Sequence, residues 1–158
     1  MKKILLTLVC CLMTVTAFAQ IKSIEVMADY RAGIIGPKGD PGIGLGITWE
    51  LAENFDVVPR FHWYLDNDAT KFNAEVDFHY NFTEISDNFY LYPVVGAGLY
   101  HYFSDDHNRI KALINAGAGI GYPLNENFNL FGEIKYQVIA GENKVSGTYI
   151  SAGISYCF

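Results

Sequence analysis

The amino-acid sequence predicts an all-β protein, an eight-stranded antiparallel up-and-down β-barrel that crosses a membrane. Three observations predict it: hydrophobicity alternates with period two, a short turn motif recurs three times, and glycines gather on the polar side of the alternation. With 51% hydrophobic and 15% aromatic residues among 158, the chain is not expected to be disordered. Its 11 Lys and Arg residues against 17 Asp and Glu residues argue against a nucleic-acid partner.

Residues 1–19 are expected to be a cleaved signal peptide, which leaves 20–158 as one barrel domain. Lys2 and Lys3 precede an apolar run, and Ala17-Phe18-Ala19 forms a cleavage site with small residues at its first and third positions. The protein is therefore expected to be exported.

The cysteines bear on a rival interpretation, a lipoprotein signal. Cys10 and Cys11 lie in the apolar run, but neither follows the small residue that lipidation requires. Their removal with the signal peptide leaves Cys157 alone, so no intrachain disulfide is expected in the oxidising compartment.

A repeated motif divides the rest of the chain into four similar units. An aliphatic residue, any residue, an acid, Asn and Phe follow one another at 51–55, 85–89 and 124–128. Acid-Asn pairs tolerate the backbone conformations of tight connections. We therefore predict three short turns on one side of the protein.

Each unit contains two predicted strands, because apolar residues occupy alternate positions in two segments. In the first two units these positions run over 24–30, 43–51, 57–65 and 72–82. The residues between them are mostly polar residues or glycine, among them Glu25, Gly44, Arg60 and Glu75. In the last two units the apolar positions run over 93–99, 112–120, 130–138 and 150–158.

Alternation alone does not say which face of the barrel is inside. A soluble lipocalin-like barrel turns its apolar face inward and a membrane barrel turns it toward lipid. Glycines on the polar face favour the second, since a narrow lumen needs room for long side chains. Aromatic residues near the strand ends, such as Trp49 and Tyr136, favour it too. The residues expected to face lipid include Phe61, Trp63, Val76, Phe78, Ile114, Ile134 and Ile154.

The last nine residues carry a resemblance. The segment 150–158 ends in Phe158, with Tyr156 and Ile154 at alternate positions before it. It resembles the C-terminal strand by which outer-membrane barrels are recognised for insertion, and the chain as a whole is similar to the OmpX and OmpA-barrel type. The resemblance implies a monomer in the outer membrane of a Gram-negative bacterium, with membrane lipid and the barrel-assembly machinery as partners.

Both chain ends would then lie on the periplasmic side, together with the three turns. The outer loops are expected near 33–42, 66–70, 104–109 and 141–147. They are short, which argues against transferring an adhesin role from that family, and no extracellular partner is predicted.

The inward polar residues are expected to form a paired charge network that fills the lumen, since an unpaired buried charge is costly. A narrow path for protons, water or a small solute is the alternative. The predicted set is Glu25, Asp29, Arg31, Glu50, Arg60, His62, Glu75, Asp77, His79, Lys111, Asn115, Glu133, Lys135 and Gln137, beside Asn73.

One pairing in this network can be predicted in detail. If paired residue numbers in the hairpin around 66–70 sum to 137, Arg60 lies opposite Asp77 and His62 opposite Glu75. Across the preceding turn a sum of 106 sets Gly46 beside Arg60 and leaves room for its side chain. We therefore expect a structural ion pair between Arg60 and Asp77.

No catalytic, cofactor or metal site is predicted. The four histidines have no metal-ligand spacing with one another or with Cys157. His101 and Ser104 lie near Asp105, Asp106 and His107, but the His-x-Ser spacing that would put both on one strand face is missing. The segment 36–42 looks like two collagen triplets, too few for a triple helix.

The predicted function is therefore non-enzymatic, a structural or surface-interaction role in the outer membrane. The alternatives are a lipid-modifying barrel enzyme, a small-solute pore and a soluble periplasmic lipocalin-like carrier. A Ser-His-acid geometry at the outer rim would favour the enzyme, an open lumen the pore, and an apolar cavity inside the barrel the carrier.

Overall fold

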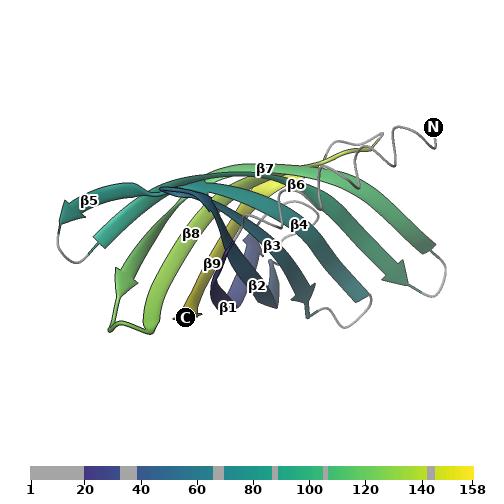
Figure 1. Ribbon diagram of the computed structural model, residues 1–158. Helices are drawn as coiled ribbons and strands as arrows, with labels where there is room; N and C mark the ends of the chain where they lie inside the picture. The colour runs from purple at the N-terminus through teal and green to yellow at the C-terminus, as the bar shows by residue number, and fades with distance from the viewer. Residues whose placement is uncertain (1–19, 33–38, 66–69, 87–88, 105–106, 142–144) are drawn as a thin grey trace.

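The computed structural model describes residues 20–32, 39–65, 70–86, 89–104, 107–141 and 145–158. These residues form nine β-strands and no helix (Figure 1). The strands are β1 (Gln20–Ala32), β2 (Asp40–Ala52), β3 (Phe55–Tyr64), β4 (Thr70–Tyr80), β5 (Phe82–Ser86), β6 (Phe89–Ser104), β7 (His107–Pro123), β8 (Phe128–Ile139) and β9 (Val145–Cys157). The predicted signal peptide lies outside the described residues, so its cleavage stays a prediction.

The strands close into a barrel with only antiparallel neighbours. The pairs β1–β2, β2–β3 and β3–β4 join strands that follow one another along the chain, as do β6–β7, β7–β8 and β8–β9, and β1 pairs with β9. Pairing between β4 and β6 closes the ring. The short β5, at the left of Figure 1, follows β4 after Asn81 and pairs only with the start of β6. Since β4 and β5 form one side of the same hairpin, the barrel has eight strands, as predicted.

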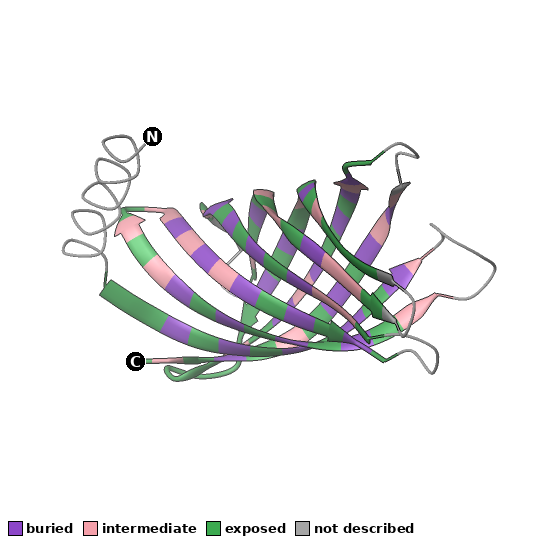
Figure 2. Ribbon diagram, turned by 90° about the vertical axis from the view of Figure 1, so that its right-hand side faces the viewer, coloured by how far each residue is buried: buried purple, intermediate pink, exposed green. Residues whose placement is uncertain are grey.

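Along most of β1 to β4 and β6 to β9, exposed or half-buried residues alternate with more buried ones, and this shows which face is outside (Figure 2). Every residue that was expected to face lipid is exposed, with Ile114 at 60% and Ile134 at 54%. The interior positions of the same strands hold charged and polar side chains and glycine, together with some apolar and aromatic side chains such as Val58, Leu113 and Tyr149. The apolar face is therefore outside, the arrangement of a transmembrane barrel.

The predicted register is correct for one hairpin and wrong for the next. Gly46 pairs with Arg60, as expected from a sum of 106. Between β3 and β4, however, Arg60 pairs with Glu75 and His62 with Asn73, which is a sum of 135 instead of 137. A shift of two residues leaves every side chain on its predicted face, so the alternation could not detect the error.

The turns at the motif end are short, as the repeat predicted. Asn54 adopts a positive φ of 65°, a conformation that Asn tolerates better than most residues. In the turn after β7, the side-chain oxygen of Asn125 accepts hydrogen bonds from the backbone N–H groups of Asn127 and Phe128. The C-terminus lies at this end too, since the backbone N–H of Phe158 donates to Lys22. Residues 87–88 lie outside the described part of the middle turn.

The four loops at the opposite end are shorter than expected, since Thr70 already belongs to β4 and residues 145–147 belong to β9. Residues 40–42 belong to β2, where Asp40 pairs with Arg31, so the first loop does not extend to Gly42. The loop predicted at 104–109 is limited to the two residues between Ser104 and His107, because these two residues pair with each other as the ends of β6 and β7. Within the described residues, none forms a helix long and apolar enough to span a membrane.

A cysteine scan tests the assignment of the two faces. A fluorophore on Ile114→Cys or Ile134→Cys should be quenched strongly by quenchers confined to the bilayer, because both side chains lie on the outer face. A fluorophore on Gln137→Cys, whose native side chain is fully buried, is the control and should respond weakly. Equal quenching at all three positions would contradict the assignment.

Candidate functional site

The interior of the barrel is the candidate site. Of the fourteen residues expected there, twelve are buried: Glu25, Asp29, Arg31, Arg60, His62, Glu75, Asp77, His79, Asn115, Glu133, Lys135 and Gln137. Lys111 is half-buried, and it takes part in none of the ion pairs between described residues. Glu50 is exposed at the mouth of the barrel, outside the network in which it was expected.

Arg60 on β3 is the centre of the network. Its guanidinium, with no exposed surface, donates two hydrogen bonds to the Glu133 carboxylate across the lumen. It also donates to Glu25 at 2.8 and 3.1 Å and to Asp77 at 3.2 Å. The planar guanidinium suits such shared binding of carboxylates. Arg60 and Asp77 therefore form the expected ion pair, although they do not lie opposite each other in the register. Each of them also has other partners, since Arg60 binds Glu25 and Glu133 as well.

A second cation, Lys135 on β8, lies next to this cluster. Its Nζ atom donates to Glu75 and, at 2.7 Å, to Asp77. The Asn115 amide donates to the same two carboxylates at 3.0 and 2.9 Å. A Cβ atom at Gly96 would collide with the Asp77 and Asn115 oxygens, so glycine there provides the room that the network occupies.

His62 connects the network to the outer half of the barrel. Its Nδ1 atom lies 2.8 Å from an Asp29 oxygen and 2.6 Å from the Tyr149 hydroxyl. Its Nε2 atom lies 2.9 Å from a Glu75 oxygen. Because His62 pairs with Asn73, Glu75 is its diagonal neighbour on β4 and not the residue directly opposite. The ring is fully buried and fills the space between β1, β4 and β9.

Aromatic rings and a second arginine fill the lumen toward the loop end. The Arg31 guanidinium lies between the rings of Tyr64 and Tyr100, 4.3 and 4.8 Å from their centroids. It donates to Asp40 at 2.9 Å, and Lys71 donates to the same carboxylate at 3.1 Å. These buried tyrosines were not among the residues expected in the interior, although they occupy the same alternate strand positions as the polar residues.

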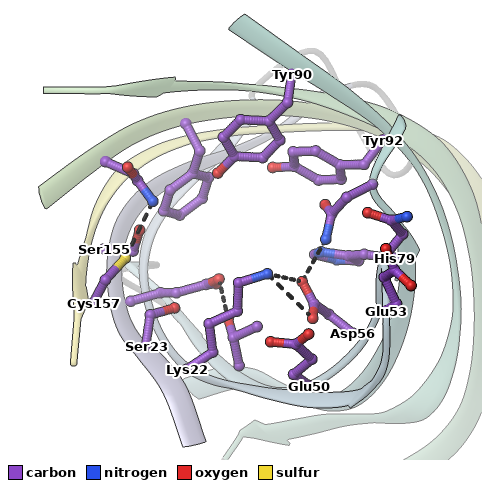
Figure 3. Close-up of a pocket in the computed structure, with 16 residues that line it drawn as sticks. Lys22, Ser23, Glu50, Glu53, Asp56, His79, Tyr90, Tyr92, Ser155 and Cys157 are labelled. Carbon is purple, nitrogen blue, oxygen red and sulfur yellow. Dashed lines mark hydrogen bonds and ion pairs between the residues drawn. The ribbon is translucent and has the colours of Figure 1, made fainter. Parts of the chain in front are cut away.

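The turn end of the barrel holds a cavity of about 260 Å³, which we call the vestibule (Figure 3). Tyr90 and Tyr92 lie on one side of it, and Lys22, Glu50 and Asp56 lie on the other. The Lys22 ammonium group donates to Asp56 at 3.1 Å. The sequence did not predict the vestibule, because its residues come from strands far apart in the chain.

Among the described residues, one group places possible metal ligands close together. Oxygens of Asp77 and Glu133 and a nitrogen of His79 lie within 4.8 Å of one another. Both carboxylates already accept hydrogen bonds from Arg60, and Asp77 also from Lys135. A divalent cation would have to displace these groups, so we propose no metal site there.

The candidate catalytic pair at the loop end receives no support. The His101 Nε2 atom lies 2.6 Å from the Asn108 side-chain oxygen, and its ring packs edge-on against Phe72. The side chains of Ser104 and His107 and the residues Asp105 and Asp106 lie outside the described part of the structure. The absence of an enzymatic activity stays a prediction.

Comparison with known proteins rests on structure. No protein-family model and no curated protein sequence matches the chain. Neisserial surface protein A is similar, with a TM-score of 0.76 at 15% identity over 89% of this chain and 99% of that one. The N-terminal β-barrel domain of Pseudomonas aeruginosa OprF has a TM-score of 0.59 at 23% identity, over 89% of this chain and 99% of that one. The chain has the fold of the small outer-membrane β-barrel proteins.

A third structure agrees with these two. Ail, the attachment invasion locus protein of Yersinia pestis, has a TM-score of 0.57 at 21% identity, over 87% of this chain and 97% of that one. The predicted resemblance to small outer-membrane barrels is thus confirmed at the level of the fold.

The shared guanidinium predicts how substitutions in the network combine. Arg60→Met should lower the free energy of unfolding by about 3–5 kcal/mol, because it leaves buried carboxylates without their cation. Adding Glu133→Gln should recover part of this loss, since it removes the carboxylate that accepts two of the Arg60 hydrogen bonds. Urea unfolding in lipid vesicles measures both.

Lys22→Met is the control, because it breaks a pair whose lysine is 43% exposed and should cost less than about 1 kcal/mol. Fully additive losses in the double variant would contradict the coupling between Arg60 and Glu133.

Proposed function

We propose that this chain is an integral protein of the outer membrane of a Gram-negative bacterium, with a structural or surface-interaction role and no catalytic activity. One observation carries the proposal: in a closed barrel, the outer face is apolar and the charges are inside. A soluble protein would lose stability by exposing so large an apolar surface to water. A lipid bilayer provides the apolar surroundings that this face requires.

The dimensions of the strands support the membrane location. About 9 to 11 residues suffice for a tilted strand to cross the hydrocarbon, and the eight barrel strands have at least 10. Aromatic side chains on the outer face lie near strand ends, among them Trp63, Tyr80 and Tyr156. Such rings favour the level of the lipid headgroups.

The interior supports a role without transport. Arg60 and its carboxylates, together with Arg31 between two tyrosines, fill the described lumen at two levels. A pore would need continuous water-filled space, which an eight-stranded barrel filled by side chains does not leave. A lipocalin-like carrier would need an apolar interior, and a fully buried guanidinium argues against it.

A surface role draws support from the neighbouring structures. One of them is called a surface protein and another an attachment invasion locus protein. A role at the cell surface is the part of these names that we transfer to this chain, and the outer membrane lipid is its immediate partner. We propose that it functions as a monomer and that the barrel-assembly machinery inserts it through its C-terminal strand.

Cell fractionation tests the proposal directly. The protein should be found in the outer-membrane fraction and should migrate faster on a denaturing gel when unheated than when boiled, because a closed barrel resists detergent at room temperature. Recovery from the soluble periplasmic fraction, with no effect of heating on migration, would overturn the proposal.

The chain end tests the proposed route of insertion. Among the described residues, Phe158 is the most exposed large apolar residue at 72%, with Ile154 and Tyr156 on the same face. Phe158→Ser should lower the amount of heat-modifiable barrel and raise the degraded fraction. Phe89→Ser is the control, since it removes an exposed phenylalanine at the same end of the barrel without altering the chain end. Equal assembly of both variants would contradict recognition through the terminal residue.

A further inference from the structure

We propose that the vestibule binds a small organic cation, a molecule that carries ammonium or guanidinium groups on a short chain. This assigns a ligand site to a protein whose proposed role otherwise concerns the membrane and the cell surface. The site itself requires only the fold. That it opens toward the periplasm rests on the proposed function.

The vestibule has the shape of a binding site. Its floor includes Glu25, which accepts hydrogen bonds from the buried Arg60 guanidinium. Beyond this floor, Lys135 and the carboxylates around it fill the lumen. A molecule that enters from the turn end therefore stops inside the barrel, in a space of about 260 Å³. Such a volume suits a molecule smaller than a drug-sized ligand.

The charges around the vestibule favour a cation. Glu50 and Glu53 lie at the mouth, and neither carboxylate takes part in an ion pair with another described residue. Asp56 forms an ion pair with Lys22, and the Lys22 ammonium group also lines the cavity. At the floor, Glu25 shares one guanidinium with two other carboxylates. The negative charges outnumber the positive ones, so the potential there is negative.

The opposite wall is aromatic. The rings of Tyr90 and Tyr92 stack with their centroids 5.8 Å apart, and Phe131 also lines the cavity. Figure 3 shows both tyrosine rings across the cavity from Lys22 and Asp56. Aromatic faces attract ammonium and guanidinium groups, and their apolar surface packs against a short aliphatic chain. Carboxylates on one side and rings on the other thus fit both parts of an organic cation.

His79 gives an independent indication of a ligand. Its side chain is 5% exposed, lines the cavity and stacks on Tyr92 with ring centroids 4.8 Å apart. Its Nε2 atom is buried and lies 4.0 Å from a Glu133 oxygen, too far for a hydrogen bond, so it has no hydrogen-bond partner in the described structure. Buried polar atoms are nearly always paired in proteins. A nitrogen of the bound cation, or a water molecule that it carries, would provide the missing partner.

A metal ion fits the vestibule less well. The carboxylates of Glu50, Glu53 and Asp56 do not belong to any described group whose ligand atoms lie within 4.8 Å of one another. A single ion requires ligands that converge at about 2.0–2.6 Å from one point. An organic cation with two separate charged ends can reach carboxylates that lie apart.

Agmatine, which has one ammonium and one guanidinium group, serves as the probe. We expect it to bind the folded full chain in detergent micelles and to move the NMR signals of the His79 ring. The ring signals of His101, at the loop end, should stay in place, and 1,4-butanediol, a neutral molecule of similar length, should have no effect. Absence of agmatine binding would overturn the proposal, as would equal shifts with the neutral diol.

Charge-removing variants locate the site. Glu50→Gln with Glu53→Gln should weaken agmatine binding by about fivefold, the effect of losing two partly exposed ion pairs. Glu126→Gln is the matched control, because Glu126 is exposed at the same end of the barrel but outside the vestibule. Both exposed positions tolerate glutamine, and heat-modifiability verifies folding.

Unchanged affinity in the double variant would overturn the assignment of the site. If Mg²⁺ alone shifted the His79 ring signals in a saturable way, the vestibule would be a metal site, and the proposal of an organic cation would be wrong. Since these measurements use isolated protein, they can fail while the membrane location holds, and the fractionation experiment can fail while the binding holds.

Discussion

Every backbone N–H and C=O group of a strand in hydrocarbon must be paired within the protein, because no water is there to replace a missing partner. This constraint requires a closed barrel, and the pairing of β4 with β6 closes it. Closure in turn fixes the direction of every side chain, since successive residues of a strand point to opposite faces. Apolar residues face the lipid, and the charged residues of the membrane-spanning segments must therefore lie in the narrow interior.

Charges that are confined to this interior must satisfy one another. Around Arg60, each cation forms ion pairs with several carboxylates. The Arg60 guanidinium pairs with Glu25, Asp77 and Glu133, and the Lys135 ammonium group pairs with Asp77 and Glu75. Six charged side chains that converge from both sides of the lumen need space. Glycines at Gly46 and Gly96 provide it where a Cβ atom would meet the charged groups. The glycine pattern and the charge network are therefore two parts of one solution to packing inside a small barrel.

The sequence predicts the faces of the barrel well, because parity along a strand is a local property. It predicts the register less well, since a shift of two residues between β3 and β4 preserves parity and leaves Arg60 within reach of Asp77. The buried tyrosines, among them Tyr64 and Tyr149, escaped prediction because an aromatic ring suits either face. The break between β4 and β5 at Asn81 has no clear signal in the alternation.

The vestibule lies beyond what sequence patterns can reveal. Glu50 was expected deep in the network, yet the strand that carries it ends near the mouth, so its carboxylate lies at the rim. The aromatic wall comes from β6 and β8 and the acidic wall from β1 to β3, and only closure of the barrel brings them together. A site of this kind depends on the diameter and register of the whole ring, which no single segment encodes.

The central claim is that the Arg60 guanidinium is buried and paired inside the barrel, and hydrogen exchange of its Nε–H group tests this most directly. Measured by NMR on the protein in lipid nanodiscs, the Arg60 Nε–H should exchange with solvent many times more slowly than that of Arg109, which is exposed at the loop end. Equal exchange rates for the two groups would contradict a buried, paired guanidinium and with it the account of the interior given above.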